Sequence, residues 1–106
     1  MIFCLGGAFN PPTLAHKQIA LTIQAAYLHA DVVFLPVGDA YGKPMERANH
    51  RVAMLEAMVS DMPKMRVDDL EVHDTLYQGA ISSLDRLRKK YGERSSLWWA
   101  WTKPSP

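Results

Sequence analysis

The chain begins with MIFCLGGAFNPPTLAH (residues 1–16), in which an apolar run passes directly into two glycines, two prolines and the start of an amphipathic segment. This order predicts a strand, a glycine turn and a helix start. Gly6 and Gly7 let a ligand approach the main chain closely, because neither carries a side chain. Thr13 stands where an N-cap is favoured, and a helix N-terminus offers free N–H groups and a positive dipole end. The stretch is therefore suited to a phosphate, and His16, three residues after Thr13, can face the same anion.

The rest of the chain alternates between strand and helix patterns. Helical spacing of apolar residues predicts a first helix from 13 to about 29, and VVFLPV (32–37) predicts a strand buried on both faces. Asn49 is expected to cap a second helix, and 65–70 is a weaker strand typical of a sheet edge. A third helix is expected to end at Gly92, before a fourth strand at 97–101. Units of this length predict an α/β fold with a parallel sheet and helices on both faces.

The composition is that of one small globular domain. The 106 residues are 48% hydrophobic and 22% charged, and the formal net charge of +1 gives no case for a nucleic-acid or membrane partner. No apolar run reaches transmembrane length, and the first five residues are too short for a signal peptide, so a cytoplasmic protein is expected. Cys4 is expected to be a small buried hydrophobe rather than a reactive thiol.

Three further groups of polar residues are interpreted as structural or solvent-exposed. The histidines lack the spacing of metal ligands, so no metal site is expected. The acidic group could suggest a cation site, but alternation along a strand points neighbours to opposite faces and favours surface charge. The basic group complements a helix C-terminus. These groups are His29, His50 and His73; Asp68, Asp69 and Glu71; and Arg86, Arg88, Lys89, Lys90 and Arg94.

The string GGAFNPPTLAH (6–16) resembles the GG-x-F-(N/D)-P-(P/x)-(H/T)-x-G-H motif of the nucleotidylyltransferase superfamily, in particular of the nicotinate or nicotinamide mononucleotide adenylyltransferases. It departs from the motif at Ala15, where the family usually has glycine. The resemblance implies a Rossmann-like parallel sheet with flanking helices, the N-terminal part of that fold, over residues 1–97. It also implies transfer of AMP from ATP to a mononucleotide phosphate. ATP is then a substrate, Mg²⁺ is held mainly by its phosphates, and the partners are small-molecule nucleotides.

The resemblance assigns roles to individual residues. The loop backbone approaches the phosphates, Asn10 orders the loop, and Thr13 and His16 donate hydrogen bonds to the triphosphate. The residues implied to bind ATP or phosphate are Gly7, Ala8, Phe9, Asn10, Thr13 and His16; those implied in catalysis are Thr13, His16 and Lys43.

A second loop, after the strand at 32–37, carries Tyr41, Gly42 and Lys43. Family members place a lysine there, commonly in an H-K pair; Gly42 replaces the histidine, so that Lys43 alone carries over. Lys43 is either a substrate contact or a solvated loop residue. The segment NHRVAMLEAM (49–58) resembles the family's H-R-x-x-M-L helix, where Arg51 either holds the loop through hydrogen bonds, the favoured interpretation, or touches substrate. The implied substrate loop thus contains Tyr41, Lys43 and Arg51.

Two departures leave the acceptor open and predict that the activity is impaired in this short chain. The family's Y-T-x-D-T-L stretch is replaced by GAISSLDRL (79–87), and nothing after Leu97 matches its second ATP motif, I-S-S-T-x-x-R. The alternatives are a phosphopantetheine adenylyl- or cytidylyltransferase, or a nucleotide-binding fragment without catalysis.

Residues 98–106 form an atypical tail with three tryptophans and two prolines within LWWAWTKPSP (97–106). Tryptophan has one codon, so WWAWT must be encoded TGG TGG GCN TGG ACN. Reading from the third base gives GTG GGC NTG GAC, or Val-Gly-(Leu/Met/Val)-Asp, which is the family's (F/V)-(V/I)-G-x-D strand. We therefore hypothesise a frameshift or truncation after about residue 97, with self-association through an exposed sheet edge.

Overall fold

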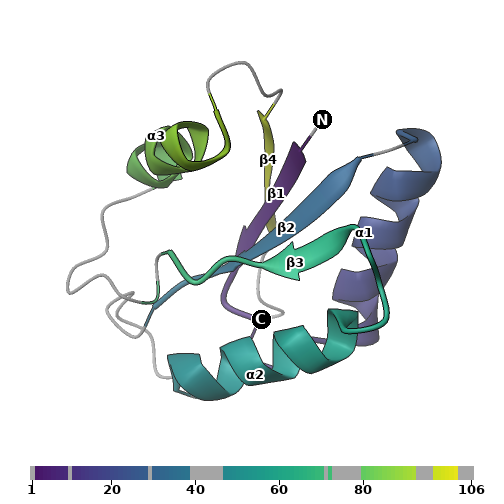
Figure 1. Cartoon of the computed structure of the whole chain (residues 1–106). Coiled ribbons are helices and arrows are strands. Elements are labelled where there is room, and N and C mark those ends of the chain that lie inside the picture. Colours follow the sequence, from purple (N-terminus) through teal and green to yellow (C-terminus); the bar gives the residue numbers. More distant parts are fainter. Residues whose placement is uncertain are drawn as a thin grey trace.

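A computed structural model describes residues 2–9, 11–28, 30–38, 47–70, 72, 80–92 and 97–102. These residues form a four-stranded parallel sheet in the order β3-β2-β1-β4, with helices between the strands (Figure 1). The α/β class and the parallel sheet with flanking helices are confirmed. The elements are β1 (Ile2–Gly7), α1 (Leu14–Ala26), β2 (Asp31–Pro36), α2 (Ala48–Val59), β3 (Met65–Val67), α3 (Ala80–Tyr91) and β4 (Leu97–Thr102).

Different helices cover the two faces of the sheet (Figure 1). On one face, Leu5 and Phe34 pack into a core with residues of α1 and α2. On the other face, Cys4 and Leu35 pack with Leu87 of α3. Consecutive residues of β1 and β2 therefore enter opposite cores, which explains why both strands read as continuous apolar runs.

The first helix is shorter than the sequence suggests. Thr13 is its N-cap, as expected, but α1 ends at Ala26 rather than near residue 29. Tyr27 has φ −126° and ψ 94°, which takes the chain out of the helix, and its carbonyl accepts a hydrogen bond from the Ala30 N–H at 3.1 Å. This turn is what returns the chain to β2, so helical spacing alone overestimates the helix.

The expected cap of the second helix is wrong. Arg47 is the N-cap of α2 and Asn49 already lies within its first turn. The buried positions are Ala48, Arg51, Leu55 and Val59, so the helix must include residue 48 to present this stripe to the sheet.

β3 is an edge strand, as expected, but it has three residues instead of the six of 65–70. It ends because the Asp68 carboxylate accepts a hydrogen bond from the Leu70 N–H at 3.0 Å and turns the chain.

The C-terminal elements follow the prediction. α3 is followed by Gly92 with φ 94°, the left-handed conformation that favours glycine after a helix. β4 then pairs with β1 in parallel, from the Ile2–Leu97 pair to the Gly7–Thr102 pair. β4 begins at Leu97, so the first five residues of the segment 98–106 belong to the sheet.

Candidate functional site

The candidate site lies where β1 and β2 end and α1 begins. The Gly7 carbonyl accepts a hydrogen bond from the Val37 N–H at 3.0 Å, so the loops that follow the two strands start side by side. Ala8, Phe9 and Val37 are buried. In an open parallel sheet this carboxyl edge is where ligands bind.

Phe9 anchors the loop after β1. Its side chain is 2% exposed, and its ring makes edge-on contacts with Phe34 at 5.7 Å and with His16 at 4.9 Å between centroids. Its backbone has φ 50°, a conformation that is costly for a residue with a side chain. The Phe9 side chain therefore belongs to the core, and what it can offer a phosphate is its main chain.

Thr13 and His16 contact each other across the first turn of α1. They form a capping box in which the Thr13 N–H donates to His16 Nδ1 at 2.8 Å; the Thr13 hydroxyl lies 3.2 Å from the same nitrogen. An Nδ1 that accepts a hydrogen bond leaves the proton of a neutral imidazole on Nε2. Burial lowers the pKa of His16, which favours this neutral form. His16 is thus set up to donate a hydrogen bond through Nε2–H.

Arg51, in α2, connects the loop after β1 with the segment after β2. Its side chain is fully buried, and its Nη1 donates to Ala8 O at 2.7 Å and to Val37 O at 2.8 Å. These are the loop hydrogen bonds that the favoured interpretation requires. Arg51 lies in the buried stripe of α2 with Ala48 and Leu55, where an apolar residue would ordinarily stand.

The structure brings together Gly7, Ala8, Phe9, Thr13 and His16, with Arg51 behind them. Asn10, Tyr41 and Lys43 lie outside the described residues, so their roles stay predictions. Ala15, where the family motif has glycine, is exposed in the first turn of α1.

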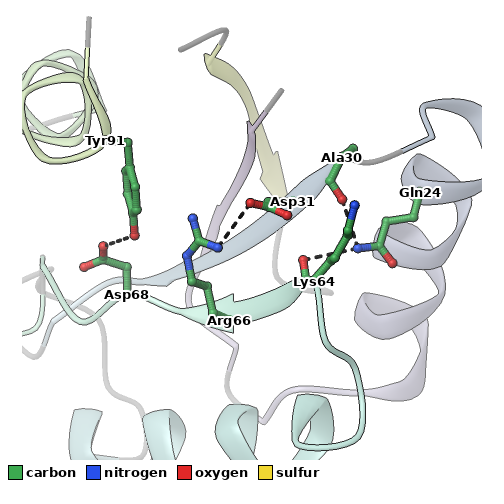
Figure 2. A network of polar contacts seen from close by, with 7 residues as sticks. All are labelled: Gln24, Ala30, Asp31, Lys64, Arg66, Asp68 and Tyr91. Atoms are coloured by element: carbon green, nitrogen blue, oxygen red, sulfur yellow. Dashed lines mark hydrogen bonds and ion pairs between the residues drawn. The ribbon is translucent and has the colours of Figure 1, made fainter. Parts of the chain in front are cut away.

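A second polar cluster lies on the α3 side of the sheet, and sequence analysis missed it. Asp68, interpreted as surface charge, is only 3% exposed. It accepts hydrogen bonds from the Tyr91 hydroxyl at 2.8 Å and the Lys90 ammonium at 2.9 Å. Figure 2 shows Tyr91 reaching down from α3 to Asp68, with Arg66 beside them on β3.

Arg66 continues this cluster along the sheet. Its guanidinium lies 4.9 Å from the Tyr91 ring centroid and 3.4 Å from the Asp31 carboxylate. Farther along in Figure 2, the Gln24 amide donates to the carbonyls of Ala30 and Lys64, both at 3.2 Å, and ties α1 to the starts of β2 and β3. These contacts thus join α3, β2 and β3 on one side and α1, β2 and β3 on the other.

Among the described residues, no three side chains of His, Cys, Asp or Glu gather as metal ligands would. The helices described in this chain are also too short or too polar to cross a membrane.

The parallel sheet, the loop at its carboxyl edge and the capped helix form a Rossmann-like class of α/β protein. A family model described as cytidylyltransferase-like matches residues 4–101, and the chain belongs to this family. The resemblance to the nucleotidylyltransferase superfamily is confirmed.

Individual relatives narrow the comparison. A probable nicotinate-nucleotide adenylyltransferase of Hahella chejuensis is 33% identical over 99 residues, covering 91% of this chain and 45% of the relative. A protein of the same name from Geobacter metallireducens is 37% identical over 93 residues, covering 85% and 42%. The chain therefore spans about half the length of the curated relatives it matches.

A solved structure shares the fold. It is the nicotinic acid mononucleotide adenylyltransferase of Plasmodium falciparum complexed with NaAD, with a TM-score of 0.76 and 17% identity. The match covers 92% of this chain and 50% of that one. The Rossmann-like architecture is confirmed by this likeness.

Proposed function

We propose that the chain serves the transfer of AMP from ATP to nicotinate or nicotinamide mononucleotide, in NAD biosynthesis. The observation that carries the proposal is the capping box of Thr13 and His16 beside the buried Phe9 loop. It combines a helix N-terminus, a close backbone approach and an imidazole fixed in one tautomer. The names of the curated relatives support the same reaction.

In this reaction an oxygen of the mononucleotide phosphate attacks the α-phosphorus of ATP in line, and the bond to pyrophosphate breaks. The triphosphate lies against the backbone of Gly7 to Asn10 and the N-terminus of α1. His16 donates Nε2–H to a phosphate oxygen whose negative charge grows as pyrophosphate leaves. No covalent intermediate is needed, because positioning and charge stabilisation supply the catalysis.

Residues outside the described part complete the proposal. Lys43 neutralises phosphate oxygens of the substrate as a compact point charge, and Tyr41 lies in the same loop. Mg²⁺ enters with ATP and is coordinated by phosphate oxygens and water. The partners are then small-molecule nucleotides, and the protein works in the cytoplasm without nucleic acid or membrane.

The test is pyrophosphate release from ATP and nicotinate mononucleotide. His16→Ala should lower turnover by about 10² or more, because one positioned donor is worth that much in the transition state. His50→Ala, which changes an exposed histidine of α2, is the matched control and should leave turnover unchanged. Equal turnover of His16→Ala and the parent chain would rule the assignment out.

The acceptor needs its own experiment, because GAISSLDRL replaces the family's acceptor stretch. Nicotinate mononucleotide, nicotinamide mononucleotide and phosphopantetheine are offered together, and we expect a pyridine mononucleotide to be used best. Preference for phosphopantetheine would move the protein to another branch of the superfamily. Binding of ATP without turnover of any acceptor would indicate a non-catalytic nucleotide-binding module.

The tryptophan-rich segment 98–106 remains proposed as the product of a frameshift. Sequencing the gene across and beyond the codons of Leu97 to Pro106 tests it: the idea is refuted if the shifted frame does not continue into the family's second ATP motif. We also propose self-association through a sheet edge, which sedimentation would detect as species larger than the monomer.

A further inference from the structure

Arg51 ties together the two loops of the candidate site through one nitrogen atom. Nη1 donates to Ala8 O in the loop after β1 and to Val37 O at the start of the segment after β2, at 2.7 and 2.8 Å. The side chain is fully buried, so both hydrogen bonds are charge-assisted and shielded from water. Movement of one carbonyl therefore disturbs the other through the same guanidinium.

The Ala8 hydrogen bond also fixes the direction of the next peptide N–H. The Ala8 carbonyl and the Phe9 N–H belong to one planar trans peptide group and point in opposite directions. Because the carbonyl points at the buried guanidinium, the Phe9 N–H points away from it. This orientation places the Phe9 N–H, a main-chain donor, on the side of the loop opposite Arg51.

Arg51 also restrains the position of the His16 ring, indirectly through Phe9. With φ 50°, Phe9 holds a conformation that a residue with a side chain keeps only where its surroundings impose it. Arg51 restrains the peptide before Phe9, and the contact with Phe34 restrains its ring. The other edge-on contact of that ring is with His16.

We infer that Arg51 is a positioning residue of the phosphate site: through Ala8 and Phe9 it orients the main-chain donor and the His16 ring, and through Val37 it couples the two loops. This inference rests on the proposed function, because it takes the loop after β1 to be the phosphate site. An anion that binds at Phe9 should then also shift the amide resonance of Gly38, the residue after Val37.

Arg51→Lys tests the inference in the whole chain. Lysine keeps the charge but has a shorter reach and no planar fork, so it cannot hold both carbonyls as Arg51 does. We expect binding of inorganic triphosphate to weaken about tenfold, the Phe9 and Gly38 amide resonances to shift, and the imidazole ¹⁵N shifts of His16 to change. Arg66→Lys is the control, since Arg66 contacts Asp31 and Tyr91 instead of the loops.

A folded Arg51→Lys variant with unchanged His16 and loop resonances and unchanged triphosphate affinity would overturn the inference, since Arg51 would then act on stability alone. Failure of the parent chain to bind triphosphate would count against the proposed function; the His16 and Phe9 signals of the variant would still decide the positioning role.

If Arg51→Lys does not fold, the parent chain gives the answer. Its Arg51 guanidinium protons should exchange slowly with water and shift together with the Phe9 and Gly38 amides during triphosphate titration. Fast exchange of those protons, or a shift at Phe9 with none at Arg51 and Gly38, would overturn the inference.

Discussion

Among the described residues, each face of the sheet buries one charged side chain, and the two faces use it differently. On the face covered by α1 and α2, Arg51 is fully buried and bonds to main-chain carbonyls of two loops. On the α3 face, Asp68 is 3% exposed and bonds mainly to side chains, those of Lys90 and Tyr91. Arg51 thus fixes the shape of loops, whereas Asp68 fixes the position of a helix.

This difference matters for function. A loop held through its own main chain keeps its N–H groups in fixed directions, which a phosphate site requires. A helix held through flexible side chains such as Lys90, whose side chain is 53% exposed, tolerates small displacements. We therefore expect substitutions of Arg51 to lower the free energy of unfolding more than substitutions around Asp68.

The largest effect is expected for Arg51→Met. Methionine fills similar space but leaves the carbonyls of Ala8 and Val37 without this donor, so the free energy of unfolding should fall by about 3 kcal/mol or more. Urea denaturation measures it. Arg66→Met is the matched control, because the Arg66 side chain is 41% exposed in its ion pair, and it should cost less than about 1 kcal/mol. Equal losses of unfolding free energy in Arg51→Met and Arg66→Met would show that the two faces do not differ in this way.

The next effect concerns Cys4, in the core of the α3 face. Burial raises the pKa of this thiol from 9.0 to about 11. As the pH rises past 9, the unfolded chain loses the thiol proton while the folded chain keeps it. Stability present below pH 9 is therefore lost on the way to pH 11, by up to about 1.4 kcal/mol per pH unit.

The comparison of the parent chain with Cys4→Ala isolates this contribution. Burial likewise raises the pKa of Tyr91, and the bond to Asp68 raises that of Lys90, so both chains lose some stability in alkali. The parent chain should lose more than Cys4→Ala between pH 9 and 11. Parallel curves for the two chains would mean that the Cys4 thiol titrates normally.

Asp68→Asn should have a smaller effect, about 2 kcal/mol, because it removes the charge but keeps one oxygen as an acceptor. A double-mutant cycle with Tyr91→Phe tests whether the lost energy belongs to the Tyr91 hydroxyl hydrogen bond. Additive losses would show that Asp68 and Tyr91 do not cooperate in holding α3.

The fold was predictable because its signals are local. Apolar runs, the cap at Thr13 and the glycine after α3 each act within a few residues, and together they predict four strands and three helices. Asp68 was misassigned because its partners Lys90 and Tyr91 lie 22 and 23 residues away, and pairing at that distance leaves no periodic pattern.

The candidate site was predictable in part, for the same reason. The motif locates Thr13 and His16, but their mutual hydrogen bond and the resulting imidazole tautomer depend on side-chain geometry. The hydrogen bonds of Arg51 span 14 and 43 residues. Asn49 was mistaken for a cap because its own preference was outweighed by burial of the α2 stripe.

The smallest effect is expected at His16, on the loop side of the comparison. Burial lowers the pKa of its imidazole, so as the pH falls below 6.5 the unfolded chain takes up a proton before the folded chain does. Stability present above pH 6.5 is then lost as the pH falls through the folded pKa.

His16→Gln is the matched variant, because glutamine at this position can still accept from the N-cap N–H but does not titrate. The difference in free energy of unfolding between the parent chain and His16→Gln should be constant above pH 7. In mild acid the parent chain should lose stability relative to the variant. An equal decline in both chains would show that protonation of His16 destabilises the folded chain no more than the unfolded one, and that His16 is not held in its neutral form.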